Sequence, residues 1–349
     1  MIQKKNVTSQ PQIILKQRLL YIDQLKGIAI LLVVMGHFIQ YNTVEGTDNA
    51  LFAVIYSFHM PLFMFISGYV AQKTIQPVIF SNYFAFLKKK GISLLLPFFA
   101  WPLLVNPFFF SPRPVAYHPL DLMIQLVKEP SGGLWFLWFL FFLTLSFSLF
   151  LYMSNKLNKT KNIFYDIIMC LPQVGLLLLL RRTSIISYTD SFILYFIFFY
   201  LGVFISRFSI FTRFILNTTV FSFAFITFLV LDGWYSFTGP NNLLIKPILS
   251  VTAIISLYYI VNTIKWTAFT DKTIRHWGQN SLVIYTTQFS FIYLLSGNFI
   301  LPALHFVPLF CITLFFSVIV IILCILIFKI VKLCAPLNLL LYGSRKTAD

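Results

Sequence analysis

The chain has 349 residues, of which 59% are hydrophobic and 10% are charged, and its mean hydropathy is +0.85. Roughly a quarter of the residues in a soluble domain are charged, so this composition excludes an ordinary soluble protein. The net charge of +16 taken alone would be compatible with a nucleic-acid partner. The positions of the basic residues decide that question.

Apolar runs of about 20 residues follow one another along the chain, and each is long enough for a helix to cross a membrane. We therefore expect an all-α, polytopic integral membrane protein with about ten transmembrane helices. Pro97, Pro102 and Pro107 interrupt the third run, and a broken helix is tolerated where neighbours or cavity water satisfy the freed carbonyl groups. The expected spans are 19–40, 51–71, 91–110, 134–153, 163–180, 190–206, 211–231, 244–262, 281–301 and 306–333.

The distribution of Lys and Arg predicts the orientation. With a cytoplasmic N-terminus, 20 of the 26 basic residues lie in cytoplasmic segments, 5 lie in outer segments and Lys26 lies within a span. Because such a bias sets topology, we expect both termini in the cytoplasm and the inner or plasma membrane as the location. The basic excess then contacts lipid headgroups, so we expect no nucleic-acid partner. The expected domains are an N-terminal segment (1–18), a transmembrane domain (19–333) and a C-terminal tail (334–349).

The four cysteines lie in or beside apolar runs without C-x-x-C spacing, so we interpret them as packing residues and expect neither a disulfide nor a metal site. They are Cys170, Cys311, Cys324 and Cys334.

Polar side chains inside the first two apolar runs mark a candidate site. Asp23, Lys26 and His37 lie in the first run. Lys26 and His37 are eleven residues apart, which puts them on one helix face about 16 Å apart in depth, and Asp23 lies one turn from Lys26 on that face. Titratable side chains at membrane depth usually face a protein interior or a watered cavity.

The second run carries His59, about 12 Å below the outer end of its helix, and Ser67-Gly68-Tyr69 near the cytoplasmic side. Two polar layers result, an outer one with two imidazoles and an inner one with a cation, a hydroxyl group, a glycine and a phenol. Imidazole is the usual general base for a hydroxyl proton, and a cation beside glycine suits an anionic carrier such as the phosphates of a coenzyme A thioester. Each residue alone also has a structural explanation, since a membrane histidine is often an interhelical hydrogen-bond partner. The residues alone therefore indicate an intramembrane polar site of an enzyme or a transporter.

The outer segments carry aromatic and acidic residues that would suit a sugar. Trp135, Asp190 and Trp234 are the candidates for acceptor binding, although an interfacial aromatic belt also explains the tryptophans. Arg181 and Arg182 at the end of the fifth run oppose the charge bias, and so are harder to dismiss as topology signals.

Four motifs resemble those of the acyltransferase family 3 membrane proteins. YIDQLKGIAILLVVMGH (21–37) resembles the opening signature, and FHMPLFMFISGY (58–69) resembles the second-helix signature of the single-domain sugar O-acetyltransferases of the fucose 4-O-acetylase type. GGLWFLWFL (132–140) and GQNSLVIYTTQF (278–289) resemble two later helices. The resemblance covers nearly the whole chain, and the first two motifs together are the specific ones.

The resemblance implies transfer of an acyl group, usually acetyl, from cytoplasmic acetyl-CoA to a sugar hydroxyl of a surface polysaccharide or its lipid-linked precursor. Lys26 and His37 match the basic-x10-His pair of the family, and 67–69 match its Ser-Gly-Tyr. Gln288 stands where many members have histidine, which puts a catalytic role at that position in doubt. No appended extracellular domain is found, so the resemblance implies a single-domain transferase without a permanently bound cofactor.

Our hypothesis assigns His37 as general base, with Asp23 and Lys26 shaping the first-helix stripe. His59 is either a second imidazole that orients the acyl group or a structural partner. The expected acyl-donor group is Lys26, Ser67, Gly68, Tyr69, Arg181 and Arg182, and the expected acceptor group is Trp135, Asp190, Trp234 and Gln288. The expected oxyanion donors are Arg181, Arg182, Ser67 and Gln288. The alternatives are a secondary transporter or glycan flippase and, disfavoured for want of a long outer loop, a glycan polymerase.

Overall fold

The structure is a computed structural model that describes residues 10–75, 82–105, 118–130, 134–157, 162–183, 189–237, 242–296 and 299–344. Within these residues, every regular element is a helix, apart from an isolated bridge between Thr43 and Leu301. The bridge fastens the C-terminal end of the first helix to the segment before the last long helix, through Val44 N to Leu301 O (3.0 Å) and Leu301 N to Asn42 O (2.8 Å). The predicted all-α class is confirmed.

Seven helices in the described part are long and apolar enough to cross a membrane, and a bent pair makes an eighth candidate. The protein is therefore a polytopic membrane protein. The seven are α1 (Gln10–Asn42), α2 (Ala50–Thr74), α7 (Trp135–Leu157), α8 (Ile163–Thr183), α9 (Thr189–Arg207), α12 (Asn242–Thr263) and α15 (Phe306–Val331). The bent pair is α10 (Ser209–Ile215) and α11 (Thr218–Asp232), which meet at 62°.

Three of the ten expected spans differ from a simple membrane helix, and the seventh (211–231) is the bent pair α10 and α11. The third is a π-helical turn (Gly91–Leu95), a short α4 (Leu96–Ala100) and a second π-helical turn (Trp101–Val105). Pro97 and Pro102 lie in the last two of these segments and lack the N–H that a regular helix needs, while residues 106–110 lie outside the described ranges. The ninth, α14, has 16 residues, which is short for a complete crossing.

The remaining helices are short. They are the 3-10 turn Gly46–Asp48, α3 (Tyr83–Lys90), α6 (Pro119–Lys128), α13 (Ala268–Gln279), α14 (Ser281–Ser296) and α16 (Ala335–Tyr342).

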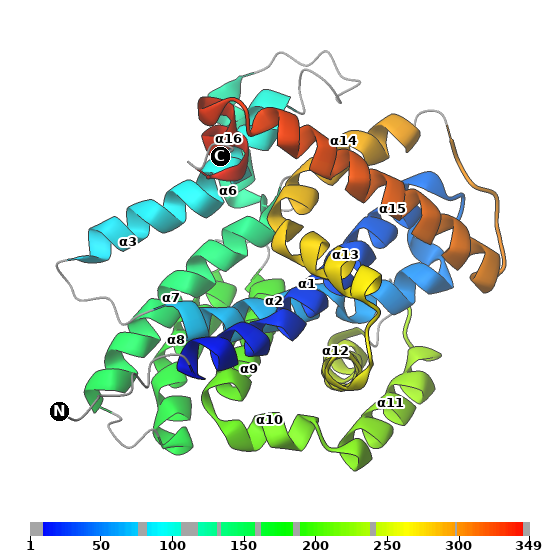
Figure 1. Cartoon of the computed structure of the whole chain (residues 1–349). Coiled ribbons are helices and arrows are strands. Elements are labelled where there is room, and N and C mark those ends of the chain that lie inside the picture. The colour runs from blue at the N-terminus through cyan, green and yellow to red at the C-terminus, as the bar shows by residue number, and fades with distance from the viewer. Residues whose placement is uncertain are drawn as a thin grey trace, which may run out of the picture.

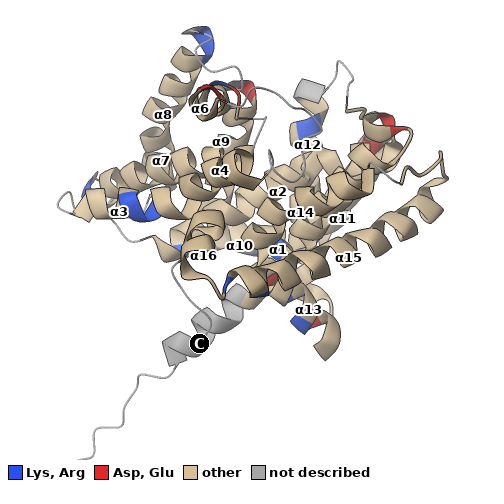
Figure 2. Cartoon of the chain, turned by 90° about the horizontal axis from the view of Figure 1, so that it is seen from above, with Lys and Arg blue, Asp and Glu red and all other residues tan. Residues whose placement is uncertain are grey.

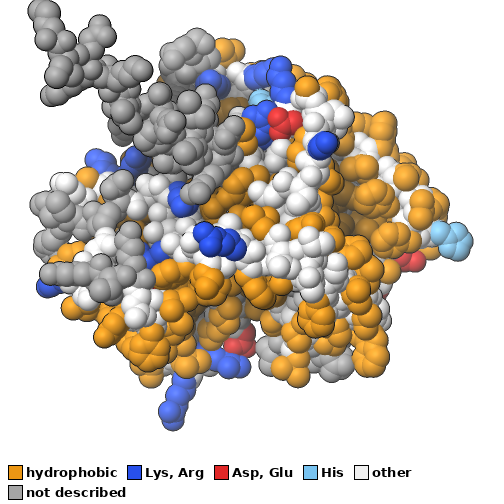
Figure 3. Space-filling view, turned by 60° about the horizontal axis from the view of Figure 1, so that its bottom comes forward, with side chains coloured by type: hydrophobic (Ala, Val, Ile, Leu, Met, Phe, Trp, Pro, Cys, Tyr) orange, Lys and Arg blue, Asp and Glu red, His pale blue; other side chains and the backbone are white. Residues whose placement is uncertain are grey.

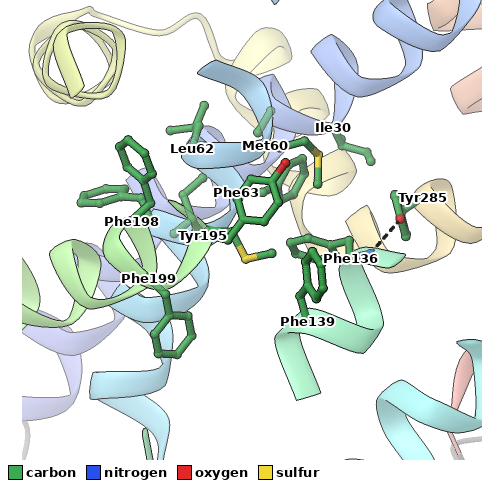
Figure 4. Packing of buried hydrophobic residues seen from close by; sticks show 14 of the residues in the cluster. Ile30, Met60, Leu62, Phe63, Phe136, Phe139, Tyr195, Phe198, Phe199 and Tyr285 are labelled. Carbon is green, nitrogen blue, oxygen red and sulfur yellow. Dashed lines mark hydrogen bonds between the residues drawn. The ribbon is translucent and has the colours of Figure 1, made fainter. Parts of the chain in front are cut away.

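Helices α1 and α2 form the centre of the molecule, with the other helices around them (Figure 1). In their most apolar stretches, 67% of the α1 residues and 72% of the α2 residues are buried, against 11% for the peripheral α8. Figure 4 shows Ile30 of α1 and Met60 and Phe63 of α2 in one apolar cluster with Phe136 and Tyr195 of α7 and α9. The two helices that carry the expected site are therefore the ones best protected from lipid.

Glycines allow two pairs of helices to pack with their backbones in contact. A Cβ on Gly68 would lie 1.8 Å from the carbonyl oxygen of Phe199, so α2 and α9 meet without a side chain between them. A Cβ on Gly27 would lie 2.0 Å from the carbonyl oxygen of Ile274, which brings α13 against the inner half of α1. Small residues serve this purpose in membrane helix packing.

A buried ion pair joins neighbouring ends of the three helices α7, α8 and α9. Arg207 Nε at the end of α9 lies 2.6 Å from Asp166 Oδ2 in the first turn of α8, and the two side chains are 6% and 0% exposed. Ser154 of α7 donates from Oγ to Asp166 Oδ1 (2.7 Å) and accepts from Arg207 Nη2 (2.8 Å). Because the two opposite charges are paired and Ser154 hydrogen-bonds to both residues, the charge is tolerated in the interior.

The surface is that of a membrane protein. Hydrophobic side chains cover much of the face in Figure 3, and Figure 2 shows the Lys and Arg bands of α3, α8, α12 and α13 at or near helix ends. The cysteines are all free, Cys170 and Cys324 being buried and Cys311 and Cys334 exposed.

Candidate functional site

The outer layer of the site is centred on His37 of α1, whose side chain is partly exposed. Its Nδ1 lies 3.2 Å from the Tyr56 hydroxyl of α2 and 3.4 Å from Gln40 Oε1, and the Tyr56 hydroxyl donates to the same Gln40 oxygen (3.1 Å). Because the amide oxygen can only accept and the phenol proton is already used, Nδ1 of His37 carries the proton in this arrangement. The lone pair of the neutral ring is then on Nε2, which is the atom available to a substrate.

His59 is held in the same tautomer but is 2% exposed. Its Nδ1 donates to the carbonyl oxygen of Ile55 one turn earlier (2.8 Å), which again leaves the lone pair on Nε2. The Tyr56 ring packs on the His59 ring with centroids 4.5 Å apart, and its hydroxyl contacts His37. Tyr56 therefore links the two imidazoles.

Tyr56 and Gln40 are site residues that the sequence reasoning missed. The signal was present in their spacing, because Gln40 lies three residues after His37 and Tyr56 three residues before His59, so each shares a helix face with its histidine. Phe289 of α14 also packs against His37, with the two ring centroids 4.6 Å apart.

The inner layer is a cavity of about 260 Å³ between α1, α2, α7, α14 and the segment after α3. Its α2 wall begins at Met60, directly after His59, and ends at Ile75, a length of about 22 Å along the helix axis. Its α1 wall contains Lys26 and Val33, and Val33 lies one turn before His37. The cavity thus leads from the C-terminal end of α2 to the level of the histidines.

Two lysines line this cavity. Lys26 Nζ lies 3.9 Å from Asp23 Oδ1, and Lys90 at the end of α3 enters from the other side. Burial, with a smaller contribution from the neighbouring Lys89, lowers the pKa of Lys90. Most other lining residues are apolar, so the cavity has a cationic inner part and an apolar path toward His59.

Not all of the expected donor residues reach the cavity. Ser67 lines it together with Lys26. Gly68 instead faces the backbone of α9, and the hydroxyl of Tyr69 is hydrogen-bonded to that of Tyr21, which also accepts from Tyr258 (3.2 Å). In this structure, Gly68 and Tyr69 hold the inner ends of the helices together.

Arg181 and Arg182 lie at the exposed end of α8 and do not line the cavity. Arg181 Nε pairs with Asp190 Oδ1 of α9 at 2.7 Å, with both side chains more than half exposed. The structure therefore brings together a predicted donor residue and a predicted acceptor residue in a surface ion pair, a type that is weak in solvent.

The remaining acceptor candidates are separated. Trp135 stacks on Tyr195 with ring centroids 5.1 Å apart, whereas Trp234 is 75% exposed. Gln288 is fully buried; its amide nitrogen donates to the carbonyl oxygen of Tyr285 (3.3 Å), and its Oε1 has no partner within the described residues. Tyr285 in turn lines the cavity, and its hydroxyl accepts from the backbone N–H of Phe136 (3.3 Å, Figure 4).

The fold and the site together define a polytopic membrane protein that places two oriented imidazoles at the end of an intramembrane cavity with cations at its inner part. Residues 19–329 match the family Acyl_transf_3, described as an acyltransferase domain. The chain therefore belongs to the acyltransferase 3 family.

Two curated relatives share part of the chain. The Nodulation protein NolL of Sinorhizobium fredii is 39% identical over 123 residues, which cover 33% of this chain and 32% of that protein. The Nodulation protein NolL of Mesorhizobium japonicum is 35% identical over 123 residues, covering 33% and 31%. The matched segment spans about a third of each relative. No solved structure matches the chain significantly.

Proposed function

We propose that the protein is a membrane O-acyltransferase of the single-domain sugar O-acetyltransferase type, similar to the fucose 4-O-acetylases. It transfers an acetyl group from cytoplasmic acetyl-CoA to a sugar hydroxyl of a cell-surface polysaccharide or its lipid-linked precursor. The N-terminus lies in the cytoplasm and the protein in the inner or plasma membrane. Acetyl-CoA is a substrate, and no cofactor is held permanently.

The observation that carries the proposal is the position of His37. Its Nδ1–H is held by Tyr56 and Gln40, its Nε2 is left for a hydroxyl proton, and it lies one turn beyond Val33 of the cavity wall. An imidazole oriented through one nitrogen and basic at the other is the usual arrangement of a general base.

The lining of the cavity supports acetyl-CoA as the donor. Lys26 and Lys90 suit the phosphates of coenzyme A, and the apolar wall up to Met60 suits its extended thioester arm. The thioester carbonyl would then arrive beside His59, which supports an acyl-orienting role for that imidazole. A role as interhelical partner is the alternative, because its Nδ1 bonds to its own helix.

In the proposed reaction, Nε2 of His37 takes the proton of the acceptor hydroxyl as the oxygen attacks the thioester carbonyl. The tetrahedral oxyanion collapses, the C–S bond breaks and the ester forms. The imidazolium returns its proton to the departing thiolate, so the histidine ends as it began. Of the expected oxyanion donors, Ser67 lines the cavity, and Gln288 is next to Phe289, which packs on His37.

The test is proton NMR of the surface polysaccharide from cells that make the wild type, His37→Ala, His305→Ala or no protein. His305 is an exposed histidine at the start of α15 and serves as the matched control. O-acetyl signals with the wild type and His305→Ala alone are the expected result, with equal amounts of each protein in the membrane fraction. Signals that persist in His37→Ala would remove His37 as the base, and identical glycans in all strains, with solute movement in vesicles, would favour a transporter.

A further inference from the structure

A proline in α2 creates an unusual junction with α12 beside His59. Pro61 has no N–H, so the carbonyl oxygen of Ser57 loses its regular helical partner. Ser250 Oγ of α12 lies 2.6 Å from that oxygen and can donate to it, and both serines are completely buried. The bond fixes which face of α12 lies against α2.

Lys246 lies on that same face of α12. It lies one turn before Ser250, whose hydroxyl is also 2.8 Å from the Lys246 carbonyl oxygen, and residues four apart share a helix face. Lys246 is the only charged residue of α12. Ser57, whose carbonyl oxygen lies 2.6 Å from Ser250 Oγ, is two residues before His59, so this face of α12 meets α2 at the level of His59. Snorkelling to headgroups would suit a lysine on the lipid side, whereas this one starts on the protein side.

The charge of Lys246 has no counter-ion among the described residues. Four ion pairs in this part of the chain join Lys26, Arg181, Arg207 and Arg275 to Asp23, Asp190, Asp166 and Asp271. Lys246 belongs to none of them. A cation at membrane depth is costly unless it is paired, so a counter-charge that arrives with a ligand would account for this residue.

A second unused polar group lies in the same outer region. The hydroxyl of Tyr235 has no hydrogen-bond partner among the described residues, although the side chain is only 7% exposed. Phe237, two residues after Tyr235, packs on the Tyr56 ring with centroids 5.3 Å apart, and Tyr56 contacts both histidines. Buried hydroxyl groups are normally bonded, so this donor also points to a ligand.

We propose that Lys246 is an anion subsite on the outer side of His59, and that it binds the carboxylate or phosphate group of the acceptor. Lysine is a common partner of such groups. The subsite would hold an acidic sugar or a sugar phosphate with a neighbouring hydroxyl toward the imidazoles. That the bound anion is the acyl acceptor rests on the proposed function, whereas binding itself requires no acyl transfer.

The test is equilibrium binding of three probes to the purified full chain in nanodiscs: methyl glucuronide, glucose 1-phosphate and the neutral methyl glucoside. We expect the wild type to bind at least one anionic probe about ten-fold more tightly than the neutral one. Which anion is preferred distinguishes a carboxylate ligand from a phosphate ligand. Lys246→Met should lose the preference and Lys246→Arg should retain it, while Lys265→Met, at an exposed lysine after α12, should leave it unchanged.

Equal affinities for all three probes in the wild type, no anion binding, or an unchanged preference in a Lys246→Met protein of normal thermal stability would overturn the proposal. If the preference depends on Lys246 but no acyl transfer is detected, the subsite stands and the proposed function fails. If acyl transfer occurs but the wild type shows no preference for the anionic probes, the subsite fails and the proposed function stands.

Discussion

The hydroxyl group of Tyr56 offers the sharpest test of the site geometry. Tyr56→Phe removes one oxygen that accepts from His37 Nδ1 at 3.2 Å and donates to Gln40 Oε1 at 3.1 Å. The ring remains, with its packing on Phe52 and His59 at centroid distances of 3.8 and 4.5 Å. The substitution therefore tests orientation of the imidazole with little change in packing.

The expected cost follows from two lost hydrogen bonds. Each contributes about 0.5–1.5 kcal/mol net, so the loss is about 1–3 kcal/mol, or a fall in kcat of about 5- to 150-fold. Because Gln40 can still accept from His37 Nδ1 at 3.4 Å, we expect the lower half of that range. The KM for acetyl-CoA should stay unchanged, since the cavity is not lined by Tyr56.

The assay is transfer of radiolabelled acetyl from acetyl-CoA to glycan in membrane vesicles, with kcat and KM measured separately. Tyr41→Phe is the matched control, because the Tyr41 ring stacks near His37 at 6.5 Å but its hydroxyl makes no hydrogen bond to the histidine. An unchanged kcat in Tyr56→Phe, or an equal fall in Tyr41→Phe, would refute the claim that the phenol sets the tautomer of His37.

Three further predictions concern the helices and the cavity. Gly68→Val should force α2 from α9 and destabilise the protein by about 1–3 kcal/mol, seen as a lower midpoint of thermal unfolding, whereas Gly175→Ala, which has nothing within 4 Å, should not. Arg207→Met should lower the free energy of unfolding by about 3–5 kcal/mol because it leaves Asp166 charged and buried. Adding Asp166→Leu should restore part of the folded yield in detergent, and an unchanged stability of the single variant would contradict this account. Since burial lowers the pKa of Lys90, its charge is lost at a lower pH than that of an ordinary lysine. As the pH rises, coenzyme A binding should therefore weaken earlier in the wild type than in Lys90→Arg, and identical pH profiles would exclude Lys90 from the donor site.

The sequence by itself determined the class of the protein. Hydrophobic runs predict helices in a membrane because each span must make its backbone hydrogen bonds within itself. That His37 and Lys26 share one face of the first helix follows from helix periodicity alone. The prolines of the third run also predicted its interruption, and the structure has π- and α-helical turns around Pro97 and Pro102. The number of spans differs, because seven or eight are evident in the described residues against ten expected.

Only the tertiary structure decided which polar groups meet. Ser67 reaches the cavity while its neighbours Gly68 and Tyr69 pack against α9 and Tyr21, because one helix turn presents adjacent residues to different partners. The sequence placed Lys246 at the start of an expected span without a partner, whereas the bond from Ser250 to the carbonyl freed by Pro61 turns this face of α12 toward α2. Such contacts depend on the relative rotation of whole helices, which interhelical packing fixes and local sequence does not encode.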